Sequence, residues 1–409
     1  MLSELRRRVF RSAPLVIAGQ VTFAVSAVVA ARTFESDAFS LYSTQLYLSA
    51  LVATGAAGIQ LDAAHEYANQ VDVRTSVRTS RYLKSLLMAG TLMGLGATAT
   101  LPLLGAFWNA PWLDLVGLPV IPMSALLFAL AFGALQGVRS FRAMFALSLF
   151  VGGWRIFALL IAKVFQINVG SIILITVSGP IVAVVIFAPL VNQYRMQVQS
   201  ILTTRLLVLT TSSISLWVLI YVDLLTLRRL SGEFDAGAVS ALLVISKGLM
   251  TLPLLIGQLM FPDMADRQVA APEKARALRR IVWLVSGLGI ALAFVIVVSA
   301  PFVLSKVFGF GESQIPRYRT IALAAVAVIP GAVAIVVGNV AMATISKSFA
   351  LISSIVATAT LVIGVSAANT IDQLLAVSIG APLLLITCVF ALRQRVLAFS
   401  RVSNTLTGG

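Results

Sequence analysis

Residues 281–304 read IVWLVSGLGIALAFVIVVSAPFVL, a run without any charged side chain between Arg280 and Lys306. As an α-helix the run would extend about 36 Å, because each residue adds about 1.5 Å. The hydrocarbon core of a bilayer is about 30 Å thick, and about 20 mostly apolar residues cross it as a helix. The stretch is therefore typical of a transmembrane helix.

Eleven further stretches share this length and apolar character, and no loop between them is long enough for a soluble domain. The sequence thus predicts an all-α polytopic membrane protein with about 12 transmembrane helices. The twelve predicted segments are 12–31, 40–61, 84–107, 117–136, 144–163, 168–190, 207–226, 237–259, 281–304, 319–343, 348–368 and 373–392.

The composition supports this class and excludes several others. Of the 409 residues, 59% are hydrophobic and 11% are charged, whereas about 25% are charged in soluble domains. The single Cys388 excludes an intrachain disulfide, and the single His65 argues against a Cys/His metal site. The chain has no Gly-x-x-x-x-Gly-Lys-Ser/Thr loop and no Ser/His/Asp set. We therefore expect no ATP motor, no enzymatic activity, no metal and no cofactor.

The net charge of +15 is read as a topology signal. With both termini in the cytoplasm, 21 of the 30 Lys and Arg residues fall in cytoplasmic segments and 7 in external loops. This bias follows the positive-inside rule and predicts a multi-pass protein of the bacterial inner membrane. The basic loops would lie against anionic membrane lipids. Nucleic acid is not an expected partner, because no basic soluble module is present.

An internal repeat divides the chain into two predicted halves, 1–200 and 201–409. Residues 32–43 and 229–240 align without gaps at an offset of 197, and each segment joins a pair of predicted helices on the external side. Six helices in each half, related by a parallel repeat, follow a known transporter plan.

The repeated segments also carry a family resemblance. The stretch from Arg32 to Tyr42 resembles the R-x-LG-x-x-x-x-G-x-Y motif after the first helix of polysaccharide-biosynthesis (O-unit) flippases. Those proteins belong to the multidrug/oligosaccharidyl-lipid/polysaccharide exporter superfamily. Here Glu35 and Ser40 replace the two glycines. The second half resembles helices 7 and 8 of the same family, with Val239 in place of the Tyr, through Tyr221-Val222-Asp223, Arg229, Gly232, Gly237 and Leu259-Met260-Phe261-Pro262.

This resemblance implies a transporter that flips a polyprenyl-pyrophosphate-linked oligosaccharide by alternating access, for surface polysaccharide biosynthesis. It implies the lipid-linked oligosaccharide as substrate, a protein that works as a monomer, and a polysaccharide polymerase and glycosyltransferases as partners.

Three charged residues are the first candidates for substrate contact. Arg155 and Lys247 lie near the centres of predicted helices, and Asp223 lies about two turns from a helix centre. A charge at mid-depth costs about 2.5–3.5 kcal/mol, so it usually faces a cavity or a partner. Guanidinium binds phosphate oxygens through two bonds, which suits a pyrophosphate. The alternative is a structural ion pair between Asp223 and Lys247.

Two further pairs are weaker candidates. Arg32 and Arg229 occupy equivalent external positions and could receive the diphosphate on release, or could anchor the interface beside nearby acids. Asp62 and His65 lie at the inner end of a predicted helix and could couple transport to an ion, since His titrates near neutral pH. The alternative for these two is a solvated helix end.

Two other functions remain open at this stage. An ion-coupled drug or small-molecule antiporter of the related multidrug-export type would need a mid-membrane acid in the first half, where this chain has Arg155. A membrane-embedded glycosyltransferase or polymerase would need a long external loop with acids or His, whereas the predicted external loops are short.

Overall fold

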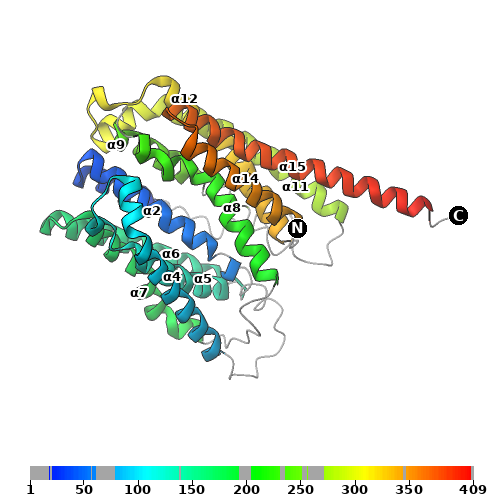
Figure 1. The fold of residues 1–409 in the computed structure, drawn as a ribbon, viewed down its shortest axis with the longest axis horizontal. Helices are drawn as coiled ribbons and strands as arrows, with labels where there is room; N and C mark the ends of the chain where they lie inside the picture. Colours follow the sequence, from blue (N-terminus) through cyan, green and yellow to red (C-terminus); the bar gives the residue numbers. More distant parts are fainter. Residues whose placement is uncertain are drawn as a thin grey trace.

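The computed structural model describes residues 18, 21–56, 58–60, 79–137, 140–192, 204–230, 235–250, 256, 271–343 and 347–406. Within these ranges every regular element is a helix and none is a strand, which confirms the all-α prediction. Figure 1 shows the helices as two groups that lie side by side, one from the blue-to-green part of the chain and one from the green-to-red part.

The first group packs around α5 and α7. Helix α5 lies against α2, α4, α6 and α7, and two short 3-10 turns, η1 and η2, connect α4 to α5. The bounds are Val21–Thr33 for a first, unlabelled helix, then α2 Ser36–Gly55, α4 Thr79–Trp108, η1 Trp112–Leu115, η2 Leu118–Val120, α5 Ile121–Gly137, α6 Phe141–Phe165 and α7 Val169–Asn192.

The second group packs around α8 and α13. Helix α8 lies against α13, α14 and α15, and α11 lies against α12 and α13. The bounds are α8 Thr204–Thr226, η3 Leu227–Leu230, α9 Ala236–Leu249, α11 Ala271–Phe302, η4 Val303–Phe308 (a π-helix), η5 Glu312–Gln314, α12 Tyr318–Val326, α13 Val328–Ala343, α14 Lys347–Ser366 and α15 Ile371–Leu406.

The helices confirm a multi-pass membrane protein. In the described ranges, nine segments are long and apolar enough to cross a bilayer. The three other predicted segments correspond to α2 and to two shorter apolar helices, Val21–Thr33 and Ala236–Leu249. The predicted segment 237–259 continues beyond α9 into residues of which only Ile256 is described.

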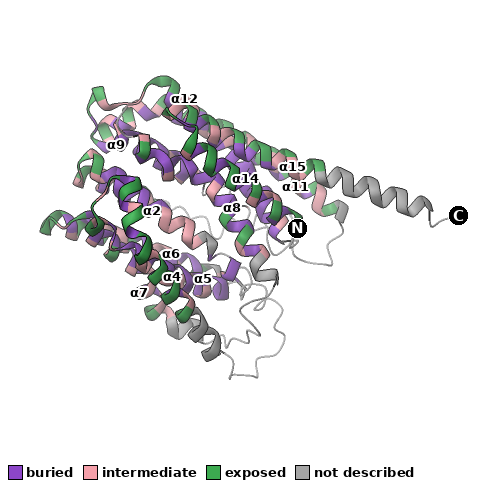
Figure 2. Ribbon diagram, viewed as in Figure 1, coloured by how far each residue is buried: buried purple, intermediate pink, exposed green. Residues whose placement is uncertain are grey.

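Helix α2 is the least apolar of these segments because it lies at the centre of the molecule. It contacts α8 and α9 of the second group as well as α5 and α7 of the first. Its polar residues Ser40, Ser43, Thr44 and Gln45 are all buried. The outer helices have the opposite pattern, since α11 exposes large apolar side chains such as Trp283 and Phe294 that suit contact with lipid. Figure 2 shows this contrast between the central and the outer helices.

The two predicted repeat segments overlap helices that lie together. Helices α2 and α9 begin at the same end of the molecule, called the hairpin end below, where Ser40 Oγ and Ser240 Oγ are 3.2 Å apart. The helix starts Ser36 and Ala236 are 200 positions apart, close to the offset of 197 on which the predicted repeat is based.

Candidate substrate site

Arg155 lies in the middle of α6, ten residues before the helix ends at Phe165. At about 1.5 Å per residue it is about 15 Å from that end. The side chain is half-buried, and its Nε is buried without a hydrogen-bond partner. The guanidinium carbon lies 5.7 Å from the centre of the Phe23 ring, a cation–π distance. None of the ion pairs between described residues includes Arg155.

Tyrosines of both groups lie near this guanidinium. Tyr42 and Tyr47 of α2 and Tyr221 of α8 lie within electrostatic range of Arg155. The Tyr47 and Tyr221 rings meet edge to face with centroids 4.9 Å apart, and Trp217 stacks on Tyr221 at 5.0 Å. Arg155 therefore faces an aromatic cluster that spans the contact between α2 and α8.

Lys247 and Asp223 form a buried ion pair. Lys247 Nζ of α9 lies 2.8 Å from Asp223 Oδ2 of α8, and their side chains are 2% and 0% exposed. Asp223 Oδ1 accepts a hydrogen bond from the Leu224 backbone N–H at 2.8 Å. This is the structural ion pair that the sequence offered as the alternative to substrate contact. Each charge thereby offsets the other within the membrane.

The ion pair and Arg155 border the same aromatic cluster. Asp223 lies within electrostatic range of Tyr47 and Tyr221, the tyrosines that also flank Arg155. On the other side, a methyl group added at Gly248, the residue after Lys247, would contact the Phe23 ring under Arg155. The three mid-membrane charges therefore lie near the same aromatic cluster, and their formal charges sum to one positive charge.

Removal of one partner from the ion pair is expected to destabilise the protein more than removal of both. Asp223→Asn leaves the Lys247 charge buried alone, which costs about 3–5 kcal/mol, whereas Asp223→Asn with Lys247→Met leaves no buried charge. Melting temperatures in detergent should therefore be lower for each single variant than for the double variant. The pair Arg319–Asp372, at 3.2 Å, serves as the control, since Arg319 is exposed and Arg319→Ala should change the melting temperature little. If the double variant lost as much stability as the two single variants together, the result would contradict the pairing.

The two external arginines predicted from sequence lie outside this site. Arg32 donates from Nε to the Val307 carbonyl and from Nη2 to the Lys306 carbonyl, both at 2.7 Å, so it binds the π-helix η4. Arg229 is an exposed residue of η3. Asp62 and His65 lie outside the described residues, so their predicted role in ion coupling stays a prediction.

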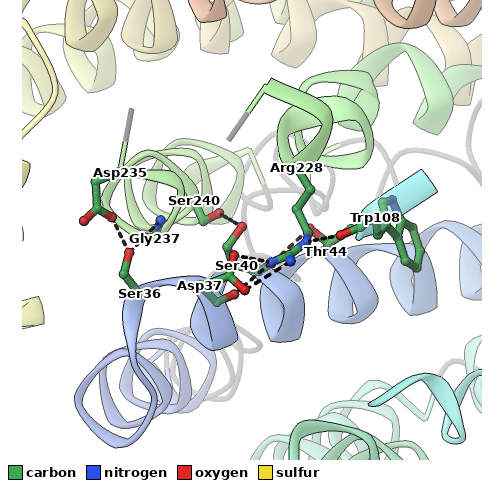
Figure 3. A network of polar contacts seen from close by, with 9 residues as sticks. All are labelled: Ser36, Asp37, Ser40, Thr44, Trp108, Arg228, Asp235, Gly237 and Ser240. Atoms are coloured by element: carbon green, nitrogen blue, oxygen red, sulfur yellow. Dashed lines mark hydrogen bonds and ion pairs between the residues drawn. The ribbon is translucent and has the colours of Figure 1, made fainter. Parts of the chain in front are cut away.

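A second polar cluster joins the two groups at the hairpin end, and the sequence did not predict it. Arg228 is buried, donates from Nε to the Trp108 carbonyl at 3.0 Å and from Nη1 to the Asp37 carbonyl at 2.8 Å, and pairs with the Asp37 carboxylate at 3.1 Å. Figure 3 shows the side chain reaching from the second group to α2 and to the end of α4. Two adjacent arginines follow α8, and nothing in the sequence distinguishes the buried one from exposed Arg229.

Shorter side chains complete this cluster between α2 and α9. Ser36 Oγ donates to Asp235 and accepts from the Gly237 backbone N–H at 3.1 Å. Ser40 and Ser240 meet four residues further along (Figure 3). These contacts and those of Arg228, here called the hairpin-end latch, hold the two groups together at one end. Toward the other end, Gly58, three residues after α2 ends, lies against Thr210 of α8.

The fold matches transporters of the MOP superfamily. A multidrug-resistance MATE-family transporter in an inward-facing conformation aligns with a TM-score of 0.62 and 11% identity, over 94% of this chain and 96% of that one. A MOP-superfamily transporter from Pyrococcus furiosus aligns with a TM-score of 0.60 and 10% identity, over 97% of each chain. The lipid II flippase MurJ, in an inward closed conformation, aligns with a TM-score of 0.59 and 12% identity, over 93% of this chain and 87% of that one.

The chain therefore has the fold of MOP-superfamily transporters along almost its whole length. No protein-family model matches it, and no curated protein matches it in sequence. The comparisons show the fold, and membership of the superfamily and of its polysaccharide flippases stays a prediction.

Proposed function

We propose that this protein is a membrane transporter that flips a polyprenyl-pyrophosphate-linked oligosaccharide across the bacterial inner membrane by alternating access, for surface polysaccharide biosynthesis. The observation that carries the proposal is Arg155, a cation at mid-membrane depth without an acidic partner among the described residues.

An unpaired cation at this depth favours an anionic substrate. Its insertion costs about 2.5–3.5 kcal/mol, and an anionic ligand would offset that cost during transport. The guanidinium offers parallel N–H donors that match two oxygens of a phosphate group. A pyrophosphate must lose much of its hydration to cross the apolar core, so a cationic site along its path lowers the barrier.

The charge balance argues against the drug antiporter as the alternative. A transporter of organic cations needs an acid free to bind the cation or the coupling ion. The acid at this site, Asp223, is neutralised by Lys247 at 2.8 Å. The site keeps one net positive charge, that of Arg155.

The ion pair also changes the role that we assign to Lys247 and Asp223. Substrate contact by either residue would require the pair to separate within the membrane. We therefore assign the substrate contact to Arg155 and a supporting role beside the aromatic cluster to the pair. Arg32 and Arg229 lie at the hairpin end, away from this contact.

Alternating access requires the two groups of helices to separate at each end in turn. The hairpin-end latch joins the groups through a few side chains at one end, while α2 lies between the groups. With cytoplasmic termini, as the Lys/Arg bias predicts, the hairpin end faces outward and the latch closes the exit. A polymerase and glycosyltransferases would act on the same lipid-linked substrate on the two sides of the membrane.

Arg155→Ala is expected to lower flipping at least tenfold, because the anionic headgroup loses its charged partner. Purified protein in proteoliposomes would be given a fluorescent polyprenyl-diphosphate sugar, and impermeant dithionite would report how much probe has crossed. Arg155→Lys keeps the charge without the two parallel donors and should retain part of the rate.

Arg142→Ala is the matched control, since Arg142 is exposed at the start of the same helix. Flipping by Arg155→Ala at the rate of this control would overturn the proposal. Transport of an organic cation that is improved by Arg155→Ala would favour the antiporter.

A further inference from the structure

Four buried polar atoms near Arg155 form no hydrogen bond with a described residue. They are Arg155 Nε, Tyr42 Oη, Tyr47 Oη and Thr176 Oγ1. Buried polar groups in folded proteins almost always have a partner, and each exception needs an explanation. The three hydroxyl-bearing side chains are only 1%, 3% and 2% exposed, so bulk solvent does not reach them in this conformation.

These atoms belong to one place in the fold. Tyr42 and Tyr47 lie on the same helix, α2, and both are within electrostatic range of Arg155 in α6. Thr176 of α7 lies beside the Tyr42 hydroxyl, and neither hydroxyl has a well-aligned hydrogen-bond partner among the described residues. Helices α2, α6 and α7 of the first group thus place these polar groups near one another.

The chemistry of the cluster favours an oxyanion. Phenol and threonine hydroxyls are protonated at neutral pH and can donate to an acceptor oxygen. Preorganised donors in a site of low dielectric constant stabilise negative charge strongly. Hydroxyl donors do so without adding further charge, which matters where each unpaired charge is costly. A headgroup with many acceptor oxygens would satisfy several of these donors at once.

We propose that Tyr42, Tyr47 and Thr176 form, together with Arg155, a donor cluster that selects a diphosphate over a monophosphate headgroup. This inference rests on the proposed function and specifies how the site recognises its substrate. A diphosphate presents oxygens on two phosphorus atoms, so it can accept from the guanidinium and from the hydroxyls together. A monophosphate leaves part of the donor set without a partner.

The melting temperature distinguishes the proposed role of the hydroxyls from a purely structural one. A buried hydroxyl without a partner destabilises the protein, so its removal from an unchanged ring should leave the melting temperature the same or raise it. Tyr42→Phe and Tyr47→Phe keep the aromatic packing, including the Tyr47–Tyr221 contact at 4.9 Å. If the hydroxyls held the fold together, both variants would melt at lower temperature.

The test compares the binding of farnesyl diphosphate and farnesyl monophosphate to the full-length protein in detergent. Each Tyr→Phe change is expected to weaken farnesyl diphosphate binding about tenfold, the effect of one lost hydrogen bond to a charged group. Binding of farnesyl monophosphate should weaken less, because this ligand uses fewer donors. Tyr318→Phe is the control, since Tyr318 is 69% exposed.

Thr176 provides a check that does not depend on ring packing. Thr176→Val removes the hydroxyl at nearly constant volume and should weaken diphosphate binding, whereas Thr176→Ser retains the hydroxyl and should bind like the wild type. Diphosphate binding unchanged in Tyr42→Phe, Tyr47→Phe and Thr176→Val would overturn the inference. Equal losses for the two ligands would overturn the diphosphate selectivity.

The outcome for Arg155 separates this inference from the proposed function. If Arg155→Ala loses farnesyl diphosphate binding and the hydroxyl variants do not, the donor cluster fails and the proposed function stands. If Arg155→Ala binds both ligands like the wild type, the proposed function fails and the donor cluster fails with it.

Discussion

Oxidation is expected to stop transport completely in a Ser40→Cys/Ser240→Cys variant, and reduction to restore it. The two serine oxygens are 3.2 Å apart at the contact between α2 and α9, so a disulfide needs only a small local adjustment. The bond would fix the two groups of helices together at the hairpin end. Alternating access requires this end to open, so a fixed end blocks every cycle. Probe flipping in proteoliposomes, before and after reduction, measures the effect.

The chain offers a matched control for this disulfide. Ser215 and Ser354 also have oxygens 3.1 Å apart, but both lie in the second group, on α8 and α14. A Ser215→Cys/Ser354→Cys disulfide should leave transport close to the wild-type rate because it joins helices that move together. Both pairs would be built with Cys388→Ser, which removes the natural thiol. Full transport by the oxidised Ser40→Cys/Ser240→Cys protein would show that the hairpin end does not open.

Arg228→Ala is expected to shift the protein strongly toward the state that is open at the hairpin end. Arg228 donates to the Trp108 and Asp37 carbonyls and pairs with the Asp37 carboxylate, all in the first group. Hydrogen bonds from a charged group contribute about 1.5–3 kcal/mol each. Loss of this set should cost the closed end about 3 kcal/mol, allowing for partial relaxation, which changes the ratio of open to closed about a hundredfold.

A cysteine at position 40 can report this shift. Ser40 is fully buried in the closed end, so an impermeant maleimide should label Ser40→Cys slowly and should label it about a hundredfold faster when Arg228→Ala is added. Arg319→Ala is the control, because Arg319 is 79% exposed and pairs with Asp372 within the second group. Equal labelling rates with and without Arg228→Ala would contradict the role of Arg228 in the latch.

The membrane helices could be predicted from the sequence because each one must by itself be long and apolar enough to cross the bilayer. The stretch 281–304 lies within α11 and the π-helix that follows it, as its uncharged length predicts. Helix α2 was harder to delimit: it begins at Ser36, four residues before the predicted segment 40–61. Its first turn contains Ser36 and the exposed Asp37, and hydropathy does not show that these polar residues bind residues of the second group.

Only part of the candidate site could be predicted from the sequence. Because a charge in the middle of the membrane is costly, the sequence alone indicated Arg155, Lys247 and Asp223 as candidates. Sequence could not decide which of them were partners, since Asp223 and Lys247 are 24 positions apart and meet only because α8 and α9 fold together. Tyr42 appeared in the sequence only as the last residue of the family motif, and Tyr47 and Thr176 gave no signal. Tyrosine and threonine are ordinary residues of membrane helices until their hydroxyls are found without partners.

The sequence by itself determined that this chain is a helical membrane protein with three costly charges. Those properties depend on each segment's own contact with lipid, which hydropathy and charge measure residue by residue. Only the tertiary structure decided that Lys247 is neutralised, that Arg155 is not, and that Arg228 rather than Arg229 closes the hairpin end. These outcomes depend on distances of a few ångströms between different helices. Coulombic and hydrogen-bond energies change steeply over such distances.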